Sequence, residues 1–309
     1  IKDTDAKGNI TTFTYDNKGN MLTMTDAMNN TVTYTYTTDY NKVASFTDEK
    51  GFTITMTYDI KGNLTQLVEP GNLIYSATYA ANGDIISSTD PKGNVFTYNY
   101  DTYGNPINVT GPNGYTATLG FDARSNLLSF TDARGNTSNL EYDILDRLKK
   151  IIDPSNKNVH GNYDNAGNPV SFINENNETS LAAYDASNRP VEITDAKGGK
   201  TFITYDAMDN LKSITNAVGS IIKFDYDNRN RLKMITDPEG NILMADYDLN
   251  GNMTTVNMPN GQVMNYSYDA LNRITSVSDL NSPILNLTYD KNSNITSFTN
   301  SGGATYTAV

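Results

Sequence analysis

The residues of this chain that could do chemistry are mostly aspartates that recur at fixed intervals. Carboxylate and amide oxygens in such rows could bind Ca²⁺, or each aspartate could cap its own turn by accepting backbone N–H groups. Neighbouring repeats on one sheet edge would stand about 9.6 Å apart, too wide to share an ion at ligand distances of roughly 2.3–2.6 Å. We therefore expect turn caps and no metal site. The caps that follow an aromatic marker are Asp16, Asp59, Asp101, Asp122, Asp143, Asp164, Asp185, Asp206, Asp227, Asp248, Asp269 and Asp290.

Composition excludes other catalytic combinations. His160 is the only histidine and cysteine is absent, so the chain cannot form a serine–histidine triad, a multi-histidine or thiolate metal site, or a disulfide. We interpret His160 as a strand-surface residue. The formal net charge of −12 disfavours nucleic acid and acidic lipid surfaces as partners. No catalytic residue and no cofactor is expected, and no apolar run approaches the length of a membrane span.

An aromatic marker precedes these aspartates and defines a repeat. Twelve of the thirteen intervals between markers are 21 residues, and only Tyr36 to Tyr58 is 22. This periodicity predicts a single array of about fourteen units over residues 1–309, truncated at both ends. The repeat tyrosines are Tyr15, Tyr36, Tyr58, Tyr79, Tyr100, Tyr142, Tyr163, Tyr184, Tyr205, Tyr226, Tyr247, Tyr268 and Tyr289, with Phe121 in the fourteenth place.

Each unit contains two turns. A second Asp-x-x-Gly-Asn turn begins about eleven residues after the tyrosine, following Thr4, Thr89, Thr131 and Thr236 in its clearest copies. Glycine at the fourth position supplies the left-handed backbone that closes a type I turn with a bulge. Where the first turn lacks glycine, we expect left-handed Ser125, Asp146, Asn188, Asp209, Asn230, Asn272 and Ser293. Tyr40 breaks this rule, so residues 37–42 are expected to form an irregular turn.

The runs between turns alternate with a period of two, as in Val32, Tyr34 and Tyr36 with threonines between them. This pattern predicts an all-β chain of antiparallel hairpins in one long sheet of close to thirty strands, without a substantial α-helix. So long a sheet must twist and curl. We expect it to coil into a spiral, shell-like or tube-like structure that buries the tyrosine rows on its inner face.

Arginine also recurs, every 42 residues, at Arg147, Arg189, Arg231 and Arg273. Two explanations stay open. The first is sequence drift between two variants of the same turn, one ending in Gly-Asn and the other in Asn-Arg. The second is a pairing of hairpins in which each arginine reaches the aspartate of a neighbouring turn.

The motif Tyr-Asp-x-x-Gly-Asn at residues 15–20, combined with Thr-Asp-x-x-Gly-Asn at residues 89–94, resembles the YD-repeat or RHS-repeat family. The resemblance covers the whole chain. Family members include RHS polymorphic toxins of bacteria, wall-associated toxins of Gram-positive bacteria, components of insecticidal toxin complexes, and animal teneurins. The resemblance implies a sheet of hairpins that spirals into a hollow shell, which in toxin members encloses a C-terminal toxic domain.

In toxin members an autoproteolytic site has catalytic aspartates near an Asp-Pro-x-Gly motif. Residues 237–240 match these four letters, but they fall in register as an ordinary second turn, as do residues 90–93. We interpret both as turns, so the chain is not expected to be an enzyme.

The leading hypothesis is a structural shell or scaffold segment of a large secreted or surface bacterial protein, whose signal lies outside this sequence. Its partners would be a C-terminal toxin or cargo domain of the same polypeptide, or neighbouring shell segments. The alternative is an adhesive or glycan-binding repeat module on the cell surface. Exposed threonine and asparagine faces would then contact glycans.

Overall fold

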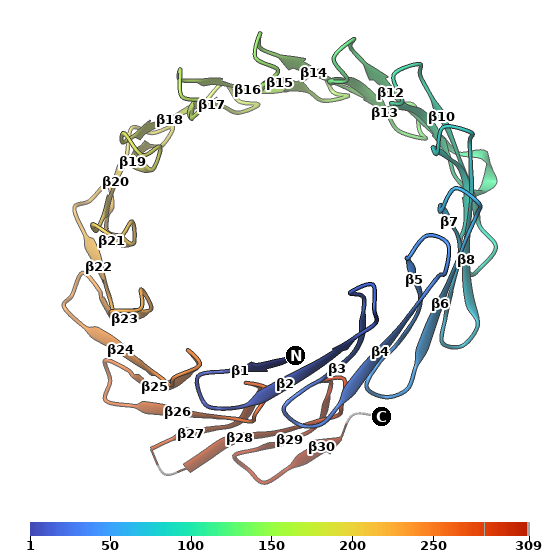
Figure 1. Cartoon of the computed structure of the whole chain (residues 1–309). Coiled ribbons are helices and arrows are strands. Elements are labelled where there is room, and N and C mark those ends of the chain that lie inside the picture. The colour runs from blue at the N-terminus through green and yellow to red at the C-terminus, as the bar shows by residue number, and fades with distance from the viewer. Residues whose placement is uncertain (281, 308–309) are drawn as a thin grey trace. The chain divides into compact units, whose positions relative to one another are not determined.

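The computed structural model describes residues 1–280 and 282–307. These residues form thirty strands in one antiparallel sheet, with a single short 3-10 element and no α-helix (Figure 1). The prediction of an all-β hairpin array is confirmed. The elements are β1 (Lys2–Thr4), β2 (Ile10–Tyr15), β3 (Met21–Thr25), β4 (Thr31–Tyr36), β5 (Val43–Thr47), β6 (Thr53–Tyr58), β7 (Leu64–Glu69), β8 (Leu73–Tyr79), β9 (Ile85–Thr89), β10 (Val95–Tyr100), β11 (Pro106–Thr110), η1 (Pro112–Gly114), β12 (Thr116–Phe121), β13 (Leu127–Thr131), β14 (Thr137–Tyr142), β15 (Leu148–Ile152), β16 (Asn158–Tyr163), β17 (Pro169–Ile173), β18 (Thr179–Tyr184), β19 (Pro190–Thr194), β20 (Lys200–Tyr205), β21 (Leu211–Thr215), β22 (Ile221–Tyr226), β23 (Leu232–Thr236), β24 (Ile242–Tyr247), β25 (Met253–Asn257), β26 (Val263–Tyr268), β27 (Ile274–Asp279), β28 (Ser282–Tyr289), β29 (Ile295–Asn300) and β30 (Thr305–Thr307).

The strands group into two compact units. Unit 1 comprises Ile1–Met56, Thr204–Ile214 and Ser220–Val309, and unit 2 comprises Thr57–Ile203 and Thr215–Gly219. The first five strands, blue in Figure 1, and the last strands, orange and red, therefore belong to the same unit. Within each unit, strands that follow one another in sequence pair antiparallel, as β3 does with β4 in unit 1 and β13 with β14 in unit 2.

Two kinds of turn alternate along the array. A Tyr-Asp turn is the five residues that begin after a repeat tyrosine, and a Thr-Asp turn is its counterpart at the other end of the strands. Across a Tyr-Asp turn the register shifts at a bulge just before the tyrosine, so that Tyr142 pairs with Leu148. Across most Thr-Asp turns the pairing has no such shift, as between Thr110 and Thr116, but β27 and β28 shift between Val277 and Ser278. Bulges increase local twist, so every hairpin carries a built-in bend at one end.

Left-handed backbone falls where the turn chemistry predicts it. Gly19 and Gly62 have φ of 87° and 80°, and all seven predicted replacements for glycine have φ between 59° and 66°. The irregular turn at residues 37–42 is also confirmed. Thr37 N–H donates to Lys42 O at 2.8 Å around a loop with one extra residue, and Asn41, instead of Tyr40, takes the left-handed conformation with φ of 54°.

The sequence predicted a face that buries the tyrosine rows, but in the structure this face is only partly buried. Among the described hydrophobic residues only Val32, Ala245 and Val256 are buried. The repeat tyrosines are half-buried, except Tyr15, which is 42% exposed. Alternation is nevertheless clear in strands such as β6, where Ile54, Met56 and Tyr58 are half-buried and the threonines between them are exposed. Side chains on the tyrosine face are covered mainly by their neighbours along the sheet, and this gives partial burial.

Candidate functional site

The Tyr-Asp turns are the most elaborate polar structures of the chain. In the turn at residues 16–20, Asp16 Oδ1 accepts the N–H groups of Lys18 at 2.8 Å and Asn20 at 2.9 Å. Asp16 Oδ2 accepts Asn20 Nδ2 at 2.8 Å, and Gly19 N–H donates to Asp16 O at 3.2 Å. Asp16 therefore bonds to three other residues of the turn, to Lys18 and Asn20 through its carboxylate and to Gly19 through its backbone carbonyl. The pKa of Asp16 lies below its usual value, mainly because the Asn20 amide donates to the charged form.

Other predicted caps make the same contacts. The turn aspartates at positions 59, 101, 122, 143, 185, 206, 227 and 269 each accept two backbone N–H groups on Oδ1. In Asp164, Asp248 and Asp290, Oδ1 accepts the backbone N–H of the residue four positions on. Thr-Asp turns follow the same plan, as Asp132 shows with Arg134 and Asn136.

Arginine turns connect each hairpin to the next one. Arg147 Nε donates to the carboxylate of its own turn, Asp143, at 2.7 Å, while its terminal nitrogen donates to Asp164 O in the next Tyr-Asp turn at 3.1 Å. The guanidinium also lies over the Tyr163 ring, 4.6 Å from its centroid. Arg231 and Arg273 repeat this arrangement on Tyr247 and Tyr289.

Asparagine turns alternate with the arginine turns and reach the next hairpin differently. Asn126 Nδ2 donates to Asp146 Oδ1 at 2.8 Å, and Asn168 Nδ2 donates to Asn188 Oδ1 at 2.8 Å. The acceptor is the left-handed residue of the next turn, which is why Asp or Asn replaces glycine there. The 42-residue period thus reflects paired hairpins. Of the two explanations for the recurring arginines, the pairing of hairpins therefore holds, and the arginine reaches the backbone carbonyl of the neighbouring aspartate instead of its carboxylate.

The repeat tyrosines add a further tie between hairpins, which the sequence pattern did not reveal. Tyr163 donates its hydroxyl to Leu148 O at 2.8 Å, and Tyr247 donates to Leu232 O at 2.6 Å. Where the structure shows this bond, the acceptor lies 15 residues earlier, at the start of the strand after the preceding Tyr-Asp turn. Tyrosine is therefore favoured over phenylalanine because its hydroxyl satisfies a backbone carbonyl at the sheet edge.

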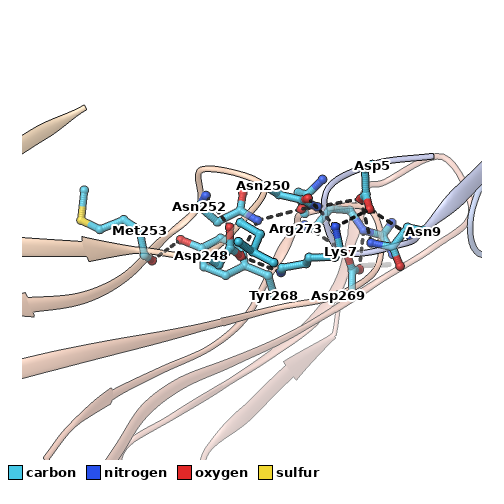
Figure 2. Close-up of polar contacts among 12 residues, drawn as sticks. Asp5, Lys7, Asn9, Asp248, Asn250, Asn252, Met253, Tyr268, Asp269 and Arg273 are labelled. Atoms are coloured by element: carbon cyan, nitrogen blue, oxygen red, sulfur yellow. Dashed lines mark hydrogen bonds and ion pairs between the residues drawn. The ribbon is translucent and has the colours of Figure 1, made fainter. Parts of the chain in front are cut away.

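In unit 1 the two kinds of turn meet across a long separation in sequence (Figure 2). Lys7 Nζ lies 2.6 Å from Asp248 Oδ2, and Asn250 Nδ2 donates to Asp5 Oδ2 at 2.6 Å. The backbone N–H of Lys7 completes the contact by donating to Asn250 Oδ1 at 3.2 Å. Each turn thus provides both a donor and a carboxylate to the other.

The same exchange occurs two repeats further along. Lys50 forms an ion pair with Asp290, and Asn292 Nδ2 donates to Asp48 Oδ2. Between these two polar contacts, Arg273 approaches the sulfur atom of Met28 at 3.3 Å. Sequence reasoning missed this row of contacts, although a basic residue at the third position of a Thr-Asp turn was visible as a pattern.

The charges in this contact are only partly exposed to solvent. The side chains of Lys7 and Asp248 are 31% and 13% exposed. Partial burial raises the pKa of Asp248, but hydrogen bonds from Lys7 and Asn252 outweigh it and bring the pKa to about 2. The pKa of Asp290 is also about 2, mainly because Lys50 donates to its carboxylate. The ionised carboxylates are thus strongly favoured where the two turn rows meet.

The arrangement supports recognition between turns better than catalysis. His160 is half-buried on β16, and its Nδ1 lies 3.0 Å from Asn158 Oδ1. Residues 237–240 form an ordinary Thr-Asp turn, with Gly240 N–H donating to Asp237 O at 3.1 Å. Among the described residues, no group of three or more His, Cys, Asp or Glu side chains is placed to hold a metal ion. None of the described helices is long and apolar enough to cross a membrane.

Comparisons with known proteins agree with this fold. The family described as Teneurin YD-shell matches residues 133–264, and the family described as RHS Repeat matches residues 1–31, 79–117 and 247–282. A search of curated proteins found no match.

Solved structures with a similar fold include toxin-complex proteins. The crystal structure of TcdB2-TccC3-TEV superposes with a TM-score of 0.77 at 16% identity, covering 96% of this chain and 18% of that one. TcdB2-TccC3 without its hypervariable C-terminal region gives 0.65 at 15% identity, over 96% and 19%. The Photorhabdus luminescens Tc holotoxin pore, with a mutation in TccC3, gives 0.62 at 15% identity, over 94% and 19%. The chain therefore spans about a fifth of each of these solved chains.

The hairpin array and its two alternating turns define the class as a tandem β-hairpin repeat protein with a shell-type fold. Within that class, the repeats match the family models for Teneurin YD-shell and RHS Repeat, the families that the motifs resemble. Shell-type repeats of these families are typically structural.

Proposed function

We propose that this array is a wall segment of a large shell, which encloses and protects a C-terminal toxin or cargo domain of the same polypeptide. The observation that carries the proposal is the likeness of 96% of the chain to TcdB2-TccC3-TEV at a TM-score of 0.77. One relative is described as having a hypervariable C-terminal region and another as part of a holotoxin pore. The comparisons do not favour the adhesive alternative.

The local structure suits a wall. A thin sheet has little core, so its stiffness must come from ties between neighbouring hairpins. Tyrosine hydroxyls, asparagine amides and arginine guanidinium groups supply such ties along one edge. Stability is then approximately a sum over hairpins and their neighbours, and the wall can be extended without a new core. Under this proposal the sheet coils with its tyrosine face toward the cargo.

The proposal also assigns partners and a location. The partners are the cargo domain and neighbouring shell segments of the same polypeptide. The protein would be secreted by a bacterium or held at its surface, since a toxin must leave the producing cell. The repeats would act as a container and contribute no catalytic group.

Limited proteolysis of the whole polypeptide that carries this segment tests the proposal. We expect the region after the repeats to resist trypsin in the intact protein and to be cleaved once the repeats are unfolded. A Lys7→Glu, Lys50→Glu variant should cleave sooner than a Lys149→Glu, Lys212→Glu variant, which has the same charge change on exposed strand positions. Equal cleavage of this region in the intact and the unfolded protein would rule out enclosure.

A further inference from the structure

The turn-to-turn contact of unit 1 uses two rows that continue elsewhere in the chain. Three successive Thr-Asp turns, at residues 5–9, 26–30 and 48–52, meet three successive Tyr-Asp turns, at residues 248–252, 269–273 and 290–294. The two rows keep the same order and advance together by one repeat. The turns that make this contact repeat along the array with the same internal hydrogen bonds, so other rows carry turns of the same local structure.

The Thr-Asp row of unit 2 carries the same basic groups. Lys92, Arg134 and Lys197 occupy the third turn position, as Lys7 and Lys50 do in unit 1. Their backbone N–H groups bond to their own turn aspartates, and all three residues are exposed. Within the part of the chain that the structure describes, their side chains form no ion pair.

The Tyr-Asp row of unit 2 is the complementary surface. Asp101 and Asp143 occupy the place that Asp248 has in unit 1. At the third position, Tyr103 and Leu145 are 69% and 64% exposed. In unit 1 the equivalent Leu271, whose turn meets a Thr-Asp turn, is half-buried. Turns of this type thus become covered when a Thr-Asp row lies against them.

We propose that the unit 2 Thr-Asp row of one copy binds the unit 2 Tyr-Asp row of a second copy of this chain. Lys92, Arg134 and Lys197 would pair with turn aspartates of the second copy, as Lys7 pairs with Asp248. The two rows differ, so the contact is head-to-tail and each copy keeps one row free for another. Each pair contributes little alone, but several pairs in register act together.

Sedimentation velocity of the 309-residue chain tests this proposal. We expect its average mass to rise with concentration at about 0.05 M salt and to fall back at about 0.5 M, because salt screens exposed charges. A Lys92→Glu, Arg134→Glu, Lys197→Glu variant should have an association constant that is lower by about tenfold or more. The control, Lys149→Glu, Lys212→Glu, Lys223→Glu, changes the net charge equally at exposed strand positions and should associate like the original chain.

A mixing experiment keeps the test independent of folding defects. A Tyr103→Lys, Leu145→Lys variant should also lose self-association, because lysine repels the basic row. Mixed one to one with the glutamate variant, it should associate again into oligomers that contain the two variants in equal amounts. The lysine-bearing row of one variant then meets the glutamate-bearing row of the other, and the two unaltered rows also bind each other. A chain that stays monomeric at every concentration and salt would overturn the proposal. Equal loss in the strand control, or no complex on mixing, would also overturn it.

Discussion

Asn250 Nδ2 donates to Asp5 Oδ2 at 2.6 Å, although 245 residues separate the two in sequence. Asp5 also organises its own turn, by accepting Lys7 N–H at 2.9 Å and Asn9 N–H at 2.8 Å. One side chain therefore links a local turn to a distant one. Because the local bonds fix the carboxylate in place, it meets Asn250 without a further loss of side-chain freedom.

Reversing the charge of Lys7 and Lys50 should weaken unit 1. Each residue pairs with a partly buried aspartate, so Lys7→Glu with Lys50→Glu should lower the free energy of unfolding by about 1 kcal/mol or more. Urea unfolding measures this. Lys92→Glu with Lys197→Glu is the matched control, with the same turn position and exposed side chains, and should change stability by less than about 0.5 kcal/mol. Equal losses in the two variants would contradict the contact.

Acid should destabilise the chain in a defined window. The pKa values of Asp227, Asp248 and Asp290 are lowered from 3.8 to about 2 in the folded chain. A lowered folded pKa gives stability that is complete above the unfolded value and is lost as pH falls through the folded value. The melting temperature should thus be nearly constant from pH 7 to about 5 and should fall steeply between about pH 4 and pH 2. A flat profile over that window would contradict the assigned pairs.

Asp59 tests the cap role of the turn aspartates. Its Oδ1 accepts Lys61 N–H at 2.8 Å and Asn63 N–H at 2.9 Å, so Asp59→Ala should cost about 0.5–1.5 kcal/mol. Asp59→Asn keeps an acceptor and should cost less. Millimolar Ca²⁺ should leave the melting temperature of the original chain unchanged. A rise of many degrees on adding Ca²⁺ would show that the aspartates act as ligands instead.

The tyrosine hydroxyl bond predicts a measurable difference between two Tyr→Phe changes. Tyr163→Phe removes the bond to Leu148 O and leaves that carbonyl without its donor, which should cost about 1 kcal/mol. Tyr103→Phe alters a ring that is 69% exposed and should cost almost nothing. Chemical denaturation of both variants measures the difference. Equal stability would show that the hydroxyl contributes nothing.

The sequence predicts the local structure well because turn chemistry is local. Aspartate at the first position and Gly, Asn or Asp at the fourth determine the loop, so Asn188 and Asp209 could be placed in left-handed backbone in advance. Period-two alternation likewise fixes which residues share a face. These features depend on contacts within about ten residues.

Contacts between hairpins were harder to predict. The bond from Tyr163 to Leu148 O depends on how one hairpin is offset from the next, which follows from a bulge and not from residue types alone. The contact of Lys7 with Asp248 joins two turns that lie far apart in the sequence, and no local motif encodes such a pairing. The alternation pattern also overestimated burial, because it indicates which face is covered but not how completely it is covered.

Tyrosine nitration tests most directly the central claim that the repeat tyrosines form the covered inner face of a shell wall. Tyr58, Tyr100, Tyr142, Tyr205 and Tyr247 are half-buried, whereas Tyr103 and Tyr115 are 69% and 64% exposed. Burial also raises the pKa of Tyr100, which disfavours the reactive phenolate. The account predicts that Tyr103 and Tyr115 are nitrated well before the five repeat tyrosines in the folded protein, and that unfolding removes the difference. Nitration of most of the five at the rate of Tyr103 would contradict it.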